Sequence, residues 1–169
     1  QVDGDDPLSA TEYMDLTMER LLANKDLDIV TCANLPLGTA VKSFRASAMQ
    51  HVYDCYKTTA NDTGFIYFFT KTGLCEHVEI DPVSPDHIFD GARLTLDYNA
   101  DLEMFRMLFE ALYREGEIFD LAAVVHFLRD NPKVVAANQG LDEDYWERTR
   151  EKAQLEYQDT NGETRRIPV

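Results

Sequence analysis

The sequence has little positive charge for its length. Its 169 residues include 16 Lys and Arg against 31 Asp and Glu, which gives a formal net charge of −15 at pH 7. A protein this acidic repels a phosphate backbone unless a local basic patch outweighs the overall field, and the sequence contains no such patch. We therefore expect no nucleic acid partner, and an anionic substrate would need a metal ion or a few well-placed cations.

Long apolar runs are also missing, so the sequence predicts neither a membrane-spanning helix nor a membrane partner. No basic, apolar leader is evident. The three cysteines, Cys32, Cys55 and Cys75, are odd in number and lack the spacing of a metal site, which favours reduced thiols. With 44% hydrophobic and 11% aromatic residues, we expect a soluble, globular, cytoplasmic protein. The glycosylation-like triplet at residues 61–63 is then a chance match.

The common signatures of phosphate and acyl chemistry are absent as well. The chain has no Gly-rich phosphate loop and no nucleophile elbow around a serine. Its four histidines show no metal-ligand spacing. A phosphate-handling activity based on this chain alone would therefore lack the usual phosphate-binding loop.

Apolar spacing and turn residues do predict a series of helices and strands. Ser9 and Glu12 match a capping box, which would begin a helix that runs to about Lys25. The apolar run from Phe65 to Phe69 is buried, but its periodicity does not decide between helix and strand. The other expected elements are strands over residues 28–33, 41–44 and 75–80, a helix over 46–56, and a helix that is capped by Asp120, buries Leu121, Val124, Val125 and Leu128, and ends at Asn131-Pro132.

The composition changes near residue 141. Residues 142–157 form a charged helical pattern that carries Tyr145 and Trp146 on an otherwise polar surface. Residues 159–162 form a turn that could join two short terminal strands. We therefore divide the chain into an α/β domain over residues 1–140 and a helical extension over 141–169, which docks onto the body or onto a second subunit.

The central stretch of the chain is residues 93–102. Leu94 and Leu96 alternate with polar residues, and helical spacing begins at Leu102. This pattern predicts a strand that ends at Asp97 and turns into a helix, which is where ligands collect in open α/β sheets. The alternative is that Asp97 is a turn acid that caps the next helix.

A second group of acidic residues, Asp3, Asp5 and Asp6, surrounds Gly4. The later ligands of an EF-hand calcium loop are missing. A magnesium site remains plausible, since Mg²⁺ takes only one or two protein carboxylates and fills its other positions with water and substrate phosphate. A solvated acidic turn is the alternative.

Together these two acidic segments resemble the cytidylyltransferases that make CMP-activated sugars: CMP-KDO synthetase, acylneuraminate cytidylyltransferase and the spore-coat-polysaccharide type. In that family one strand ends in Gly-Asp-(Asp/Glu/Cys)-Pro-Leu, which is similar to residues 4–8, and a later strand ends in a Val-Asp-Thr-Pro-Glu-Asp-Leu pattern, which is similar to residues 96–102. The family's Asn-x-x-Pro-x-Gly loop and Val-x-x-Phe segment are matched by Asn34, Pro36, Gly38, Val41 and Phe44.

The resemblance covers residues 1–140 and implies the C-terminal part of a nucleotidyltransferase. It implies a Rossmann-like, GT-A-like sheet with flanking helices and a Mg²⁺ ion held by the catalytic residues Asp5 and Asp97. The sugar hydroxyl would attack the α-phosphorus of CTP and release pyrophosphate, in surface polysaccharide biosynthesis. Gly38, with Lys42, Arg45 and Arg93 near it, would face the sugar or sugar acid, and a homodimer is a further expectation.

The sequence departs from the family in four places, one of which is Tyr98, where the family commonly has a helix-capping Thr. Ala40 and Lys42 replace the acidic residues that follow the glycine loop, which leaves the identity of the sugar open. The family's Arg-Glu-His-Val-Thr segment, expected near residues 61–67, is not preserved. The family's N-terminal nucleotide-binding half has no counterpart, so we expect a fragment that needs another polypeptide for its cytidine site. The alternative is a non-catalytic binding or dimerisation module that kept the fold.

Overall fold

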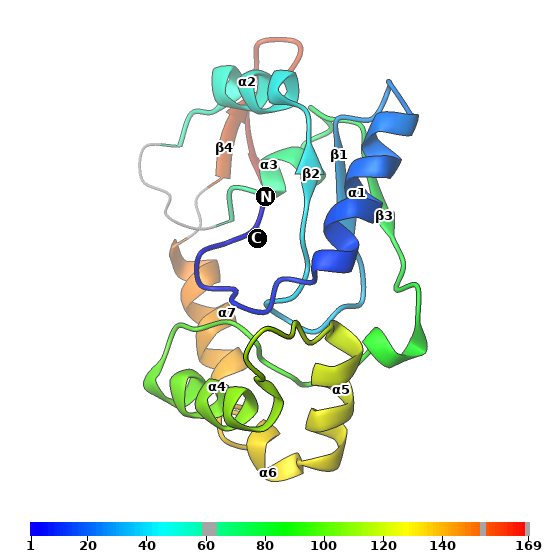
Figure 1. The fold of residues 1–169 in the computed structure, drawn as a ribbon. Helices are drawn as coiled ribbons and strands as arrows, with labels where there is room; N and C mark the ends of the chain where they lie inside the picture. The colour runs from blue at the N-terminus through cyan, green and yellow to red at the C-terminus, as the bar shows by residue number, and fades with distance from the viewer. Residues whose placement is uncertain (59–63, 153–154, 168–169) are drawn as a thin grey trace.

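The computed structural model describes residues 1–58, 64–152 and 155–167, and it has a mixed α/β fold (Figure 1). The triplet at residues 61–63 lies outside the described residues. In chain order the elements are α1 (Thr11–Ala23), β1 (Ile29–Cys32), β2 (Ser43–Phe44), α2 (Ala46–Cys55), α3 (Tyr67–Thr70), β3 (His77–Ile80), the short 3-10 helix η1 (Pro85–His87), α4 (Asn99–Leu112), α5 (Leu121–Asp130), α6 (Pro132–Val135), α7 (Leu141–Lys152), β4 (Leu155–Gln158) and β5 (Thr164–Ile167).

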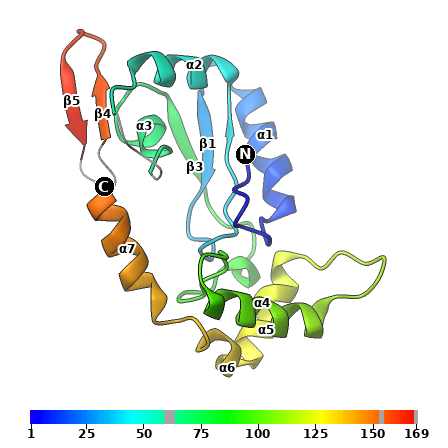
Figure 2. The same cartoon turned by 90° about the vertical axis from the view of Figure 1, so that its left-hand side faces the viewer.

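The main sheet has three strands in the order β2-β1-β3. The central strand β1 pairs antiparallel with β2 and parallel with β3, with Val30 opposite Val78. Ile29 and Val30 are fully buried, as expected for β-branched residues in a central strand. Helix α1 lies on one side of this sheet and α3 on the other (Figure 2). The strands predicted over residues 28–33, 41–44 and 75–80 are confirmed in slightly shorter form.

Below the sheet, α4, α5 and α6 pack together around a second core (Figure 1). Helix α5 follows its sequence prediction closely. The Asp120 carboxylate accepts a hydrogen bond from the Ala123 amide at 2.8 Å, and all four predicted core residues of the helix are buried. The helix stops before Asn131-Pro132, because proline cannot donate the amide hydrogen bond that would continue it.

The strand predicted over residues 93–97 does not form. Arg93 makes a single parallel bridge to Leu37, in which the Leu94 amide donates to the Leu37 carbonyl at 2.8 Å. Further along, the Leu96 amide donates to the Asp5 carbonyl at 2.8 Å. The segment is extended, but its partners are two separate loops, so no continuous ladder is built. The following helix α4 begins at Asn99, earlier than the apolar spacing predicts.

The capping box predicted at Ser9 and Glu12 is also wrong. Helix α1 starts after Ala10 and has no side-chain cap. The Ser9 hydroxyl donates to the Asp6 carbonyl at 3.0 Å, and Glu12 accepts from the Leu121 amide at 3.1 Å. The side-chain oxygens of Ser9 and Glu12 that a capping box would need are therefore used in other hydrogen bonds.

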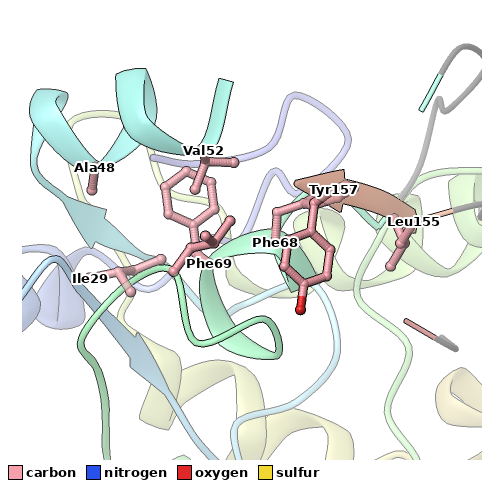
Figure 3. Close-up of a cluster of buried hydrophobic side chains, with 8 residues drawn as sticks. Ile29, Ala48, Val52, Phe68, Phe69, Leu155 and Tyr157 are labelled. Atoms are coloured by element: carbon pink, nitrogen blue, oxygen red, sulfur yellow. The ribbon is translucent and has the colours of Figure 1, made fainter. Parts of the chain in front are cut away.

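The C-terminal segment differs from its prediction in one part. Helix α7 ends at Lys152, and Leu155–Gln158 is the strand β4, paired antiparallel with β5 across the predicted turn. Leu155 and Tyr157 are buried beside Val52 and Phe68, in the core between α2, α3 and the sheet (Figure 3). The residues between Phe65 and Phe69, left undecided by their periodicity, include the short helix α3, which buries Phe68 and Phe69. The extension thus docks onto the body.

Candidate functional site

A pocket of about 560 Å³ opens where the N-terminal segment, the loop after β1, the segment before α4 and helix α7 meet. The acidic N-terminal residues form one side of it, and Gly38, Lys42 and Thr95 lie on the neighbouring loops. Its lining residues are Gln1, Asp3, Gly4, Asp5, Asp6, Leu37, Gly38, Ala40, Lys42, Gly64, Phe65, Ile66, Tyr67, Phe69, Thr95, Tyr145, Trp146 and Thr149. The pocket therefore gathers residues that are far apart in the sequence.

The two acidic segments of the sequence meet at this pocket. The Thr95 hydroxyl lies 3.4 Å from the Asp5 carbonyl oxygen and 3.4 Å from Oδ2 of Asp97. Burial raises the pKa of the Tyr145 hydroxyl, and the negative charges of Asp97 and Asp5 raise it further. Thr95 thus contacts both segments, and the charges of both carboxylates act on the Tyr145 hydroxyl of α7.

Gly38 makes the approach of the loop to residues 94–95 possible. Its φ is +88°, a conformation that side chains other than glycine rarely adopt. A Cβ atom at this position would lie 2.2 Å from the Leu94 carbonyl oxygen and 2.7 Å from the Thr95 amide nitrogen. The glycine of the family-like loop therefore has a physical role in joining the two walls of the pocket.

The cation in the pocket lining is Lys42, whose ammonium lies 2.8 Å from a carboxylate oxygen of Asp3. Burial would raise the pKa of Asp3, but the hydrogen bond and charge of Lys42 outweigh it and lower the pKa. The pKa of Asp6 is raised to about 6, because burial penalises its charged form and Asp5 and Asp3 repel it, while a hydrogen bond from Thr95 opposes the shift. The pocket therefore carries a surplus of negative charge.

Arg93, expected near the sugar, is instead buried, with 1% of its surface exposed. It pairs with three carboxylates, on Asp97, on Asp101 at 3.1 Å and on Asp142 at 3.4 Å. Burial would lower the pKa of the guanidinium, but the charges of Asp101 and Asp97 outweigh it and raise the pKa. The rings of Tyr98 and Tyr145 lie 5.3 and 4.9 Å from the guanidinium carbon.

Arg45, also expected near the sugar, does not line the pocket. Its guanidinium donates to the carbonyls of Leu27 at 2.7 Å, Leu21 at 2.8 Å and Asn24 at 3.0 Å. These carbonyls lie at and after the C-terminal end of α1, where a cation is favourable because the last carbonyls of a helix have no intrahelical partner. Of the four residues expected to face the sugar, the structure brings Gly38 and Lys42 to the pocket.

A metal would find few protein ligands here. Within residues 1–58, 64–152 and 155–167, no group of three or more His, Cys, Asp or Glu side chains could hold an ion. Within the described residues, the Asp5 carboxylate and Oδ1 of Asp97 accept no hydrogen bond, although the Asp5 backbone carbonyl accepts one from the Leu96 amide. Mg²⁺ takes only one or two carboxylates from a protein and its remaining ligands from water and phosphate, so the assignment of Mg²⁺ to Asp5 and Asp97 stays a prediction.

The sequence predictions missed the contribution of α7. Tyr145, Trp146 and Thr149 line the pocket, and α7 is fixed to the body through Asp142 and Arg93. The sequence did contain a sign that α7 contributes to a site, namely two adjacent aromatic residues, Tyr145 and Trp146, on an otherwise charged helix. The pairing of Lys42 with Asp3 had no sequence signal, because nothing local connects residues 39 positions apart.

Comparison with known proteins adds one distant relative. The chain is 24% identical over 145 residues to the uncharacterized protein MJ1063 of Methanocaldococcus jannaschii, an alignment that covers 83% of this chain and 57% of that protein. The chain thus spans little more than half the length of this relative. No family model matches the chain, and no solved structure matches it. Within the described part of the chain, no helix has the length and apolar character needed to cross a membrane.

Proposed function

We propose that this chain is the metal-side and sugar-side part of a Mg²⁺-dependent cytidylyltransferase, which activates a sugar or sugar acid as its CMP derivative for surface polysaccharide biosynthesis. The observation that carries the proposal is the meeting of the two acidic segments at one pocket. The Leu96 amide donates to the Asp5 carbonyl at 2.8 Å, and Thr95 bridges Asp5 and Asp97. Asp5 lines the pocket, whereas Asp97, 92 positions further along the sequence, lies outside the lining and is connected to it through Thr95.

In this proposal Asp5 and Asp97 hold the metal ion. Bound Mg²⁺ would neutralise the phosphates of CTP and polarise the α-phosphoryl group. Oδ2 of Asp97 is paired with Arg93 and lies 3.4 Å from the Thr95 hydroxyl, so Oδ1 would be the oxygen that holds the ion. Gly38 keeps the loop close enough to residues 94–95 for the pocket to form.

The charge of the pocket supports a role for a divalent ion. Asp3, Asp5 and Asp6 would repel the triphosphate of CTP, and Lys42 is already paired with Asp3. A metal ion between the carboxylates and the phosphates removes this repulsion and supplies the attraction. We therefore expect CTP to bind this site weakly without Mg²⁺ and strongly with it.

A non-catalytic binding or dimerisation module is the second candidate. It is favoured by the ion pair between Asp97 and the buried Arg93, since this pair alone would explain why an aspartate stands at position 97. In that case the carboxylate would stabilise the fold and would take no metal. The two candidates differ in whether position 97 affects metal-dependent nucleotide binding.

The test uses the polypeptide expressed together with whatever coding sequence precedes it in its gene. Calorimetry measures CTP binding with and without Mg²⁺, and a coupled assay measures pyrophosphate release with KDO, N-acetylneuraminic acid and N-acetylglucosamine. We expect Asp97→Asn to remove the Mg²⁺-dependent part of CTP binding and to lower kcat/KM by about 100-fold, or about 2.7 kcal/mol.

Asp15→Asn is the matched control, because Asp15 is exposed on α1 and lies outside the pocket. It should leave both measurements unchanged. Thermal unfolding of both variants separates a loss of metal binding from a loss of fold. Equal CTP affinity with and without metal, and with either residue at position 97, would contradict the transferase and favour the second candidate.

A further inference from the structure

The charges in the pocket bear on the class of sugar that it accepts. The charged side chains in its lining are Asp3, Asp5, Asp6 and Lys42, so three carboxylates face one ammonium group. The ammonium lies 2.8 Å from Asp3 and is already neutralised by it. A ligand that brings a further carboxylate would meet a negative surface.

Three cations near the pocket are engaged in other contacts, and Arg150 lies in a neighbouring hollow on α7. A guanidinium is the best partner for a carboxylate, because it donates two parallel hydrogen bonds. Arg93 is surrounded by three carboxylates with its side chain at 0% exposure, and Arg45 is bound to backbone carbonyls around the end of α1. Lys71 lines a neighbouring pocket, where its ammonium lies 4.1 Å from the centre of the Tyr67 ring.

Helix α7 gives the pocket lining an aromatic surface suited to a sugar ring. Trp146 is 37% exposed, and its ring lies 5.2 Å from that of Tyr145 in an edge-to-face arrangement. Aromatic side chains combine a large apolar face with polar edges, and the apolar face of a pyranose ring packs well on them. The ion pair between Asp142 and Arg93 fixes this wall to the rest of the site.

Resting on the proposed function, we propose that the acceptor of this pocket is a sugar without a carboxylate, a neutral or amino sugar whose ring packs against Trp146. The surplus of carboxylates selects against a sugar acid, and the aromatic wall of α7 binds the ring. This assignment distinguishes between the two substrate classes that the resemblance leaves open.

Trp146 provides its own measurement, because it is the single tryptophan of the chain. Its fluorescence is titrated with N-acetylglucosamine as the neutral probe and with KDO and N-acetylneuraminic acid as the acidic probes. We expect the neutral probe to change the emission in a saturable way and both acids to bind about tenfold more weakly, from one like-charge contact near the surface. The difference should narrow at high salt, which screens exposed charges.

Charge variants test the cause of this selectivity. Asp6→Asn should raise the affinity for the two acids by about threefold and leave that for N-acetylglucosamine unchanged, since one repulsive charge of the lining is removed. Asp15→Asn, at an exposed position outside this lining, should change neither affinity. Lys71→Met should also leave both unchanged, because Lys71 lies outside the pocket.

Two results would overturn the inference: an acid that binds as tightly as the neutral probe, or no probe that changes Trp146 emission. Failure of the transferase is recognised separately. Neutral sugar binding without CTP-dependent pyrophosphate release would count against the transferase and leave the inference standing. Release that is fastest with a sugar acid would count against the inference and leave the transferase standing.

Discussion

Gly38→Ala is the sharpest test of how the pocket is built. The added Cβ atom would lie 2.2 Å from the Leu94 carbonyl oxygen and 2.3 Å from its carbon, so the loop and the segment must move apart by more than an ångström. This movement breaks the 2.8 Å hydrogen bond from the Leu94 amide to the Leu37 carbonyl. It also opens the packing around the Leu94 side chain, which is 1% exposed.

The cost can be estimated from three contributions. Alanine at positive φ costs about 1 kcal/mol relative to glycine. The broken hydrogen bond costs about 1 kcal/mol, and partial exposure of a buried leucine costs about 1–2 kcal/mol. We expect Gly38→Ala to lower the free energy of unfolding by about 3–4 kcal/mol, which corresponds to a fall in Tm of roughly 6–16 °C for a chain of this size.

Gly116→Ala is the matched control, measured beside Gly38→Ala by urea and thermal unfolding. Gly116 also has a positive φ, +80°, but an added Cβ atom would have no heavy atom within 4 Å. The control therefore carries the conformational cost of about 1 kcal/mol without the clash. The reasoning is refuted if the two variants lose the same stability, because the close approach to Leu94 would then have no energetic consequence.

Two further predictions concern charge. The pKa of Asp6 is raised from 3.8 to about 6, so this group stabilises the fold fully below pH 3.8 and loses that contribution as pH rises through about 6. Urea unfolding should find Asp6→Asn more stable by about 1–2 kcal/mol near pH 7, after solvent screening, with no gain near pH 4. Arg93→Met should lower the free energy of unfolding by about 3–5 kcal/mol, because the fully buried Asp101 loses its counter-ion. Arg106→Met, at an exposed ion pair, should change it little, and equal losses would contradict the role of Arg93.

The sequence predicted the elements whose information is local. Helix α5 combines a capping aspartate, four apolar residues at helical spacing and a terminating Asn-Pro, and all of these act within a few residues of one another. Strand β1 was equally clear, because three β-branched residues follow one another. The turn between two terminal strands was predicted, but the helix was extended to residue 157, over Leu155 and Tyr157, which alternate with polar residues in strand β4.

The candidate site could be predicted only in part, because the residues next to a Lys or Arg in the sequence do not show which group its side chain will bind. Arg45 follows a short strand in the sequence, but the carbonyls that it binds belong to α1 and the loop after it. Arg93 alternates with apolar residues as an exposed strand residue would, but Asp101 and Asp142 draw it into the interior. Gly38 and the two acidic segments were identified by their motifs. Such motifs determine the conformation of the backbone more strongly than the identity of the ligand.

The arrangement around Arg93 explains how Asp97 could serve both the fold and a metal. Three carboxylates share one guanidinium, so the cluster has more negative charge than Arg93 can compensate. Asp101 also accepts hydrogen bonds from the amides of Asp97 and Tyr98, at 3.0 and 2.9 Å, which fixes the backbone at position 97. A cation at Oδ1 of Asp97 would therefore relieve repulsion while Asp101 and Asp142 keep Arg93 paired. The carboxylate in excess of the charge of Arg93 is the group to which the proposed function assigns Mg²⁺.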